Sequence, residues 1–218
     1  MTNSAHDLQH IRSLMDRSTR FLSLSGLSGV FAGACALAGA FVAQRYIARH
    51  FDILVDPLRY GTSAEVRTAY WQHVSFLVAV ALSVLVLALL GAFWFTWRRS
   101  RKLGHSLFDR TAIRLAVNML VPLAAGGIFC LALLYYGLPG LVPSATLLFY
   151  GLALLNASKY TLDEIRWLGL SEVVLGLIAA FWIGAGLLFW AIGFGVLHIF
   201  YGGLMYLRHD RNDAPTTG

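Results

Sequence analysis

Long apolar stretches, separated by short polar segments, follow one another along most of the chain. A helix rises about 1.5 Å per residue, so about 20 apolar residues cross the roughly 30 Å hydrocarbon core of a bilayer. The apolar residues run continuously and do not alternate with polar ones, which favours membrane-spanning helices over a β-barrel. The pattern predicts an all-α polytopic membrane helix bundle with six transmembrane helices, at about 21–43, 72–97, 114–136, 141–158, 168–183 and 187–207.

The last two of these helices come from a single apolar stretch, residues 168–207, which is twice as long as one crossing requires. A turn at Gly184–Gly186 divides the stretch into two spans. Gly193 and Gly195 offer a rival break, but a turn there leaves a short final helix and places His198 near the outer surface. We therefore expect the turn at Gly184–Gly186.

Basic residues determine the predicted orientation. Of the 17 Lys and Arg residues, 13 flank the spans on the side that holds both termini, and four lie on the other side. Cytoplasmic loops carry the excess of Lys and Arg, so both termini are predicted to be cytoplasmic and the spans to form three hairpins. We expect an N-terminal cytoplasmic amphipathic helix at 1–20, a six-helix transmembrane domain at 21–208 and a cytoplasmic tail at 209–218.

Composition supports the membrane assignment. With 58% hydrophobic residues, 13% charged residues and a mean hydropathy of +0.66, the chain is too apolar for a soluble domain. The topology also accounts for the basic run at 98–114, so we expect no nucleic-acid partner. The expected partners are the lipid bilayer and either a second copy of the chain or a membrane or cytoplasmic protein.

Motifs for catalysis and for cofactor or metal binding do not occur in the sequence. It has no Walker loop, no HExxH and no Cys pair with metal-ligand spacing, and Cys35 and Cys130 both lie inside predicted spans. Haem ligation by His73 and His198 requires similar depths in the bilayer, and their predicted depths differ by about half its thickness. No enzyme activity, catalytic residue, metal site or cofactor is predicted.

Small residues recur at helical spacing in three of the spans, where they allow close helix packing. Gly29 and Gly33 form one row in the first span and Ala residues form a second row, so this span is expected at the centre of the bundle. A homodimer seam uses the same pattern. The second span is expected at the periphery. The predicted packing positions are Gly29, Gly33, Gly176, Ala180 and Gly195.

A few polar side chains interrupt the apolar spans, and His198 lies near the middle of the last one. Intramembrane polar groups are costly and usually face protein or water. Counted from the cytoplasmic side at the helical rise, three polar residues lie roughly 5 Å deep and two lie roughly 13 Å deep, with Tyr201 between the two layers. If they converge, they line a polar pocket open to the cytoplasm, and if not, each bonds a neighbouring helix. The candidate pocket residues are His198, Tyr201, Glu172, Asn156, Asn118 and Tyr150.

Two segments resemble known proteins. IRSLMDRSTRFLSLSGLSGVFAG at 11–33 and WAIGFGVLHIFYGGLMY at 190–206 resemble a group of uncharacterised bacterial polytopic integral membrane proteins with no assigned function. The resemblance implies a multi-pass protein of the bacterial inner membrane, and it brings no activity with it.

Two classes of function fit these observations. The first is small-solute or proton-linked transport, or ligand sensing, through the cytoplasm-facing pocket. The alternative is a non-catalytic membrane scaffold or regulatory partner protein, and a membrane enzyme is the weakest hypothesis. A wet, converging set of side chains at His198 favours the first class, whereas a dry and fully hydrogen-bonded histidine favours the scaffold.

Overall fold

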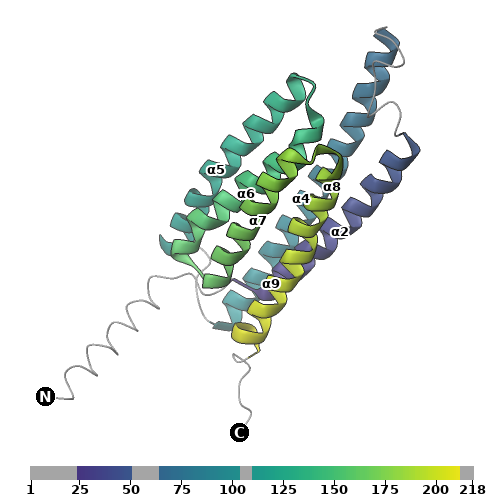
Figure 1. Cartoon of the computed structure of the whole chain (residues 1–218). Coiled ribbons are helices and arrows are strands. Elements are labelled where there is room, and N and C mark those ends of the chain that lie inside the picture. Colours follow the sequence, from purple (N-terminus) through teal and green to yellow (C-terminus); the bar gives the residue numbers. More distant parts are fainter. Residues whose placement is uncertain (1–23, 51–63, 104–109, 212–218) are drawn as a thin grey trace, which may run out of the picture.

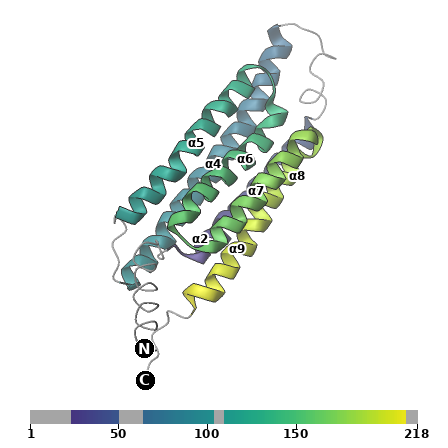
Figure 2. The same ribbon diagram turned by 60° about the vertical axis from the view of Figure 1, so that its left-hand side comes forward.

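The computed structural model describes residues 24–50, 64–103 and 110–211, and its helices pack side by side in one elongated bundle (Figures 1 and 2). All regular elements in these residues are helical, which confirms the all-α prediction. The predicted amphipathic helix at 1–20 and residues 212–218 of the predicted tail lie outside the described residues.

The bundle consists of five long helices and a composite final segment. The long helices are α2 (Gly26–Arg49), α4 (Ala64–Leu103), α5 (Arg110–Tyr135), α6 (Val142–Ala157) and α7 (Asp163–Phe181). The final segment consists of α8 (Gly186–Trp190), the π-helix η5 (Ala191–Leu197), α9 (His198–Met205) and the π-helix η6 (Tyr206–Asp210). Short 3₁₀ turns η2 (Pro139–Leu141), η3 (Ser158–Tyr160) and η4 (Ile183–Ala185) connect some of them.

Several helices extend beyond the apolar spans that the sequence predicts. Helix α4 covers 40 residues, and α7 begins at Asp163 rather than at residue 168. Polar residues beyond the hydrocarbon can continue a helix because water or headgroups solvate their side chains. Hydropathy thus locates the apolar part of a helix and misses its ends.

Five of the helical segments are long and apolar enough to cross a membrane, which supports a multi-pass membrane protein. They are Gly26–Arg49, Val66–Lys102, Arg110–Tyr135, Pro139–Tyr160 and Ile183–Asp210. Helix α7 is not among them because of its charged residues. Two acidic residues lie in its first turn, and Arg166 and Glu172 follow them. The sixth crossing, α7, therefore stays a prediction.

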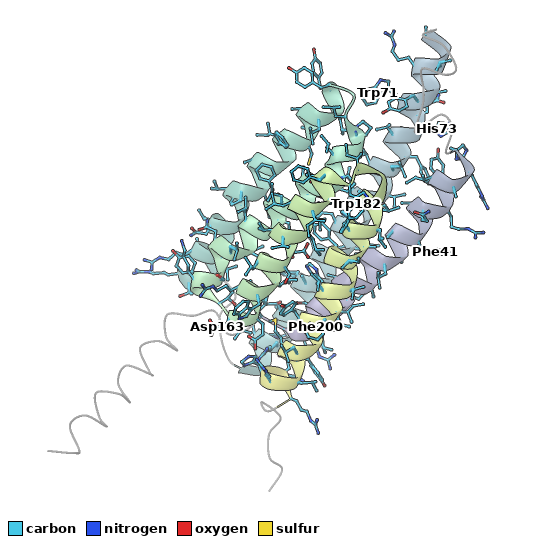
Figure 3. All side chains as sticks on the ribbon, in the orientation of Figure 1. Phe41, Trp71, His73, Asp163, Trp182 and Phe200 are labelled. Carbon is cyan, nitrogen blue, oxygen red and sulfur yellow. The ribbon has the colours of Figure 1, made fainter. Side chains whose placement is uncertain are left out.

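Charged and aromatic side chains mark the two ends of the bundle. Asp163 and His73 lie at opposite ends (Figure 3). We call the end with Asp163 and Asp210 the Asp210 end, and the end with His50 and His73 the His73 end. By the positive-inside rule the Asp210 end is the predicted cytoplasmic end, and this orientation stays a prediction.

The turn between α7 and the final segment lies at Trp182, whose backbone leaves the helical region at φ −126° and ψ 60°. The expected turn at Gly184–Gly186 is thus right to within a few residues. The rival break at Gly193 and Gly195 is wrong as a turn, because both residues lie inside the π-helix η5. There they serve close packing, since an added Cβ on Gly195 would overlap the side chain of Leu37.

Helix α2 packs between α4 on one side and η5 with α9 on the other, which agrees with the central position expected from its two small faces. Helix α4 is peripheral as expected, and none of its most apolar stretch is buried. In each of the first two predicted hairpins the two helices pack against each other, α2 on α4 and α5 on α6. The third is only partly right, because α7 packs mainly on α6 and the final segment mainly on α2.

Glycines explain this pairing. A Cβ added at Gly33 would lie 2.6 Å from the carbonyl oxygen of Gly195, and one at Gly202 would lie 2.7 Å from that of Gly26. Gly29 also faces Gly202, so the first row of small residues packs inside the chain against the final segment.

Helix α7 uses its glycines in the same way against α6. A Cβ at Gly176 would lie 2.7 Å from the backbone nitrogen of Leu148, and Ser144 donates a 2.8 Å hydrogen bond to the Gly176 carbonyl. Ala180 is only half-buried, and its neighbour Ala179 is buried. The predicted row on this helix is therefore correct at Gly176 and shifted by one residue at Ala180.

Candidate functional site

Three of the predicted pocket residues, Tyr150, Glu172 and His198, meet in the interior of the bundle, and we call them the Glu172 cluster. Tyr150 lies on α6, Glu172 on α7 and His198 at the first position of α9. The exposed fraction is 0% for Glu172 and 6% for His198. The cluster thus joins α6, α7 and the final segment far from either end of α7.

Both ring nitrogens of His198 form hydrogen bonds. Nδ1 lies 3.0 Å from the carbonyl oxygen of Gly193, and Nε2 lies 2.8 Å from the hydroxyl of Tyr150. A carbonyl can only accept, so Nδ1 carries a proton. In the neutral ring Nε2 then accepts from Tyr150, and in the charged ring it donates to Tyr150.

The π-helix makes the Gly193 carbonyl accessible to this side chain. The backbone N–H of His198 bonds to the Gly195 carbonyl, and the imidazole takes the Gly193 carbonyl five residues back. π-Helical turns often occur at functional sites. In the sequence the only signal of this acceptor is the pair of glycines considered as a break.

Glu172 is the unusual member of the cluster. Oε1 lies 3.4 Å from His198 Nδ1, and no described residue donates a hydrogen bond to either carboxyl oxygen. The carboxyl group packs against Gly193 and Leu147, and a Cβ added at Gly193 would overlap Oε2. A buried carboxylate without a donor is costly, so the group needs either its own proton or a positively charged neighbour.

Aromatic rings surround the imidazole on the side of the final segment. The Phe194 ring stacks on His198 with centroids 5.8 Å apart and an interplanar angle of 23°, and Tyr150 lies 5.0 Å from Phe194. Aromatic faces attract a cation. These rings thus help to fix the orientation of the imidazole.

The other three predicted pocket residues do not join the cluster. Asn156 donates a 2.9 Å hydrogen bond to the backbone carbonyl of Asn118, whose own amide bonds the Arg114 carbonyl. Tyr201 packs against an apolar core that includes Leu154 and Met205. The expected cytoplasm-facing pocket is therefore not assembled from these six residues, because they separate into a buried cluster, an α5–α6 contact and a core position.

Surface hollows occur elsewhere on the bundle. One of about 370 Å³ is lined by Arg67, Trp71 and neighbouring α4 residues, and one of about 240 Å³ is lined by Phe41, Arg45 and neighbours. Both lie towards the His73 end, away from the Glu172 cluster.

Two ion-pair networks at the Asp210 end hold the final segment in place. Asp210 accepts hydrogen bonds from Ser25 Oγ at 3.0 Å and from the backbone N–H of Gly26 at 3.1 Å, and it pairs with Arg99. A carboxylate from the other end of the chain thus caps the N-terminus of α2, where the helix dipole favours negative charge. This contact was not predicted, because Arg99 entered the prediction only as a topology signal.

Glu164, in the first turn of α7, forms the second network with Arg208 at 3.2 Å and His209 at 3.3 Å. Burial alone raises the pKa of Glu164. Hydrogen bonds from its own backbone N–H, His209 and Arg208 outweigh burial and hold the pKa below its ordinary value of 4.5. These bonds fasten α7 to the end of the final segment.

The chain matches no protein-family model, no curated protein and no solved structure. The function proposed below therefore comes from the geometry of this chain alone.

Proposed function

We propose that the chain is a six-span integral membrane protein in which the Glu172 cluster binds and releases a proton. Proton binding there drives small-solute transport or ligand sensing across a bacterial inner membrane, with the Asp210 end in the cytoplasm. The observation that carries the proposal is Glu172, an acid with no exposed surface and no hydrogen-bond donor among the described residues, 3.4 Å from His198 Nδ1. Ionisable residues inside a membrane bundle commonly belong to ion or proton pathways.

The hydrogen bonds define how the proton is held. Because Nδ1 already donates to the Gly193 carbonyl, an added proton binds at Nε2, and it reaches Nε2 through the Tyr150 hydroxyl. Tyr150 then accepts a hydrogen bond from Nε2 instead of donating one. The charged ring gains Glu172 as its counter-ion, which removes the cost of leaving a lone carboxylate in the bundle.

A non-catalytic membrane scaffold is the second candidate. It is favoured by the complete hydrogen bonding of His198 and by its burial, since both nitrogens have partners and 6% of the residue is exposed. In a scaffold the cluster only fixes the positions of α6, α7 and the final segment.

Proton flux into liposomes separates the two candidates. The protein is reconstituted with a pH-sensitive dye inside, a pH gradient is imposed, and a potassium diffusion potential with valinomycin balances the charge. The proposal predicts proton entry above that of empty liposomes, and loss of most of it in Glu172→Gln and His198→Gln. Tyr150→Phe should slow entry as well, because the phenyl ring cannot pass a proton to Nε2.

Asn118→Ala serves as the matched control, because Asn118 lies on the bundle outside the cluster and should leave the flux unchanged. Flux equal to that of empty liposomes, or equal in parent and Glu172→Gln, would favour the scaffold.

A further inference from the structure

A second histidine site lies at the His73 end, where α2 ends and α4 begins. His50 is the C-cap residue of α2, and its ring centroid lies 4.5 Å from that of His73 on α4. Figure 3 shows His73 on the part of α4 that lies beside the end of α2. The two rings therefore bridge two helices, although the residues are 23 positions apart in the sequence.

Tyr46 contacts both imidazoles, and in each ring the contact is to Nδ1. His50 Nδ1 lies 3.0 Å from the backbone carbonyl of Tyr46, and His73 Nδ1 lies 2.6 Å from its hydroxyl. The Tyr46 ring is itself held by stacking on Phe76, with centroids 4.0 Å apart. The orientation of each imidazole is thus set by its Nδ1.

Among the described residues, neither Nε2 atom has a hydrogen-bond partner. The Tyr46 carbonyl can only accept, so His50 carries its proton on Nδ1 and the neutral ring has its lone pair on Nε2. The Tyr46 hydroxyl can accept as well as donate, so His73 can adopt the same tautomer. Metal-binding histidines usually show this pattern, in which one nitrogen donates to a carbonyl or another oxygen and the other binds the metal.

We propose that His50 and His73 bind a transition-metal dication such as Zn²⁺ through their Nε2 atoms. Imidazole nitrogen suits Zn²⁺, Cu²⁺ and Ni²⁺, whereas Mg²⁺ and Ca²⁺ need oxygen ligands. Among the described residues no third His, Cys, Asp or Glu joins the pair, so water completes the coordination of the metal. The exposed Arg45 and Arg49 on the same helix also disfavour an ion held by charge alone.

The bound metal ties the end of α2 to the start of α4. These segments are otherwise joined by residues 51–63, and the two helices pack along their length. Metal binding to the folded protein should therefore raise its thermal unfolding midpoint. The site is separate from the Glu172 cluster and does not depend on its function.

Calorimetric titration of Zn²⁺ into the tag-free protein in detergent at pH 7.5 tests the proposal. We expect one Zn²⁺ per chain and affinity at least about 10-fold weaker in His50→Gln and in His73→Gln, because each variant loses a ligand. Tyr46→Phe keeps the ring on Phe76 but removes the hydroxyl, and second-shell losses of this kind weaken binding about 10-fold or more. Excess Mg²⁺ should not compete.

His209→Gln is the matched control, since it removes a histidine at the opposite end and should leave Zn²⁺ binding unchanged. Unfolding midpoints with and without Zn²⁺ give a second readout, and Zn²⁺ should raise the midpoints of the parent and of His209→Gln more than those of the other variants. No Zn²⁺ binding by the parent, or the same affinity in the parent and both His50 and His73 variants, would overturn the proposal.

Discussion

Single ionisable residues in apolar surroundings are the most informative positions in this chain. Glu172 and His198 were identifiable from the sequence because a charge inside a long apolar stretch is costly. Their contact was left open, because the polar residues could converge on one pocket or could each bond a neighbouring helix. In the structure Glu172 lies nine residues, or about 14 Å, from the start of α7, and at this level it meets His198.

Two further contacts could not be predicted from the sequence, that of His198 with the Gly193 carbonyl and that of Asp210 with the N-terminus of α2. The first depends on a π-helical register that amino-acid spacing does not reveal. The second joins residues 184 positions apart, and nothing in the local sequence of either indicates the partner.

Among single residues, Glu164 should make the free energy of unfolding depend on pH. A carboxyl group whose folded-state pKa is lowered contributes stability that is fully present above pH 4.5 and is lost as the pH falls through the folded-state pKa. Glu164→Gln should lower the free energy of unfolding at pH 7 by about 1 kcal/mol or less, because Arg208 is largely exposed. Thermal unfolding of both proteins in detergent from pH 7 to 3 measures the difference, which should shrink below pH 4.5.

Arg166→Gln is the control for that experiment, because it removes an exposed charge two residues away on the same helix. A difference between Glu164→Gln and the parent that stays constant down to pH 3 would rule out this role for the ion-pair network.

Helix elements are paired by their small residues more than by their order in the chain. The row through Gly29 and Gly33 correctly predicted close packing on α2, and its neighbour is the final segment. The sequence could not identify that neighbour, since a row of glycines fits any flat partner, including a second copy of the chain. In the structure the row packs against the final segment of the same chain, and α7 packs against α6 instead.

Two adjacent glycines of α9 provide a sharp test of the contact between α2 and the final segment. A Cβ at Gly202 would lie 2.7 Å from the Gly26 carbonyl and the Val30 nitrogen, whereas none at Gly203 meets an atom within 4 Å. Gly202→Ala should therefore destabilise the protein by about 1–3 kcal/mol, because backbone atoms cannot yield. Gly203→Ala should be neutral or stabilising by up to about 1 kcal/mol through helix propensity.

Unfolding midpoints of the two variants in the same detergent check this prediction. Equal midpoints would show that the final segment does not pack on α2 as described.

At the scale of the whole molecule, continuous apolar stretches were enough to predict an all-helical membrane bundle with a peripheral α4. They were not enough to establish how many helices cross, because α7 is long enough but carries charge at its start and Glu172 in its middle. Those acids have partners inside the bundle, Glu164 at the Asp210 end and Glu172 beside His198. We therefore still expect α7 to cross, because polar groups inside a membrane usually face other helices rather than lipid.

Thiol labelling of intact bacterial cells tests the crossing by α7. Lys159 and Gly184 are exposed and lie on either side of α7, so each is replaced by Cys in a chain without Cys35 and Cys130. An impermeant reagent should label Gly184→Cys in intact cells and Lys159→Cys only after the membrane is opened. Labelling of both residues from the same side would mean that α7 does not span the membrane.

The central claim is that the Glu172 cluster exchanges a proton, and nitrogen NMR of His198 in nanodiscs measures this directly. The His198 signals of the ¹⁵N-histidine-labelled protein are assigned by comparison with His198→Gln. We predict a proton on Nδ1 alone at high pH and on both nitrogens at low pH. In Glu172→Gln the change should move to lower pH, because the charged ring loses its counter-ion. A ring that keeps one proton on Nδ1 from pH 8 to 5, alike in the parent and in Glu172→Gln, would contradict the claim.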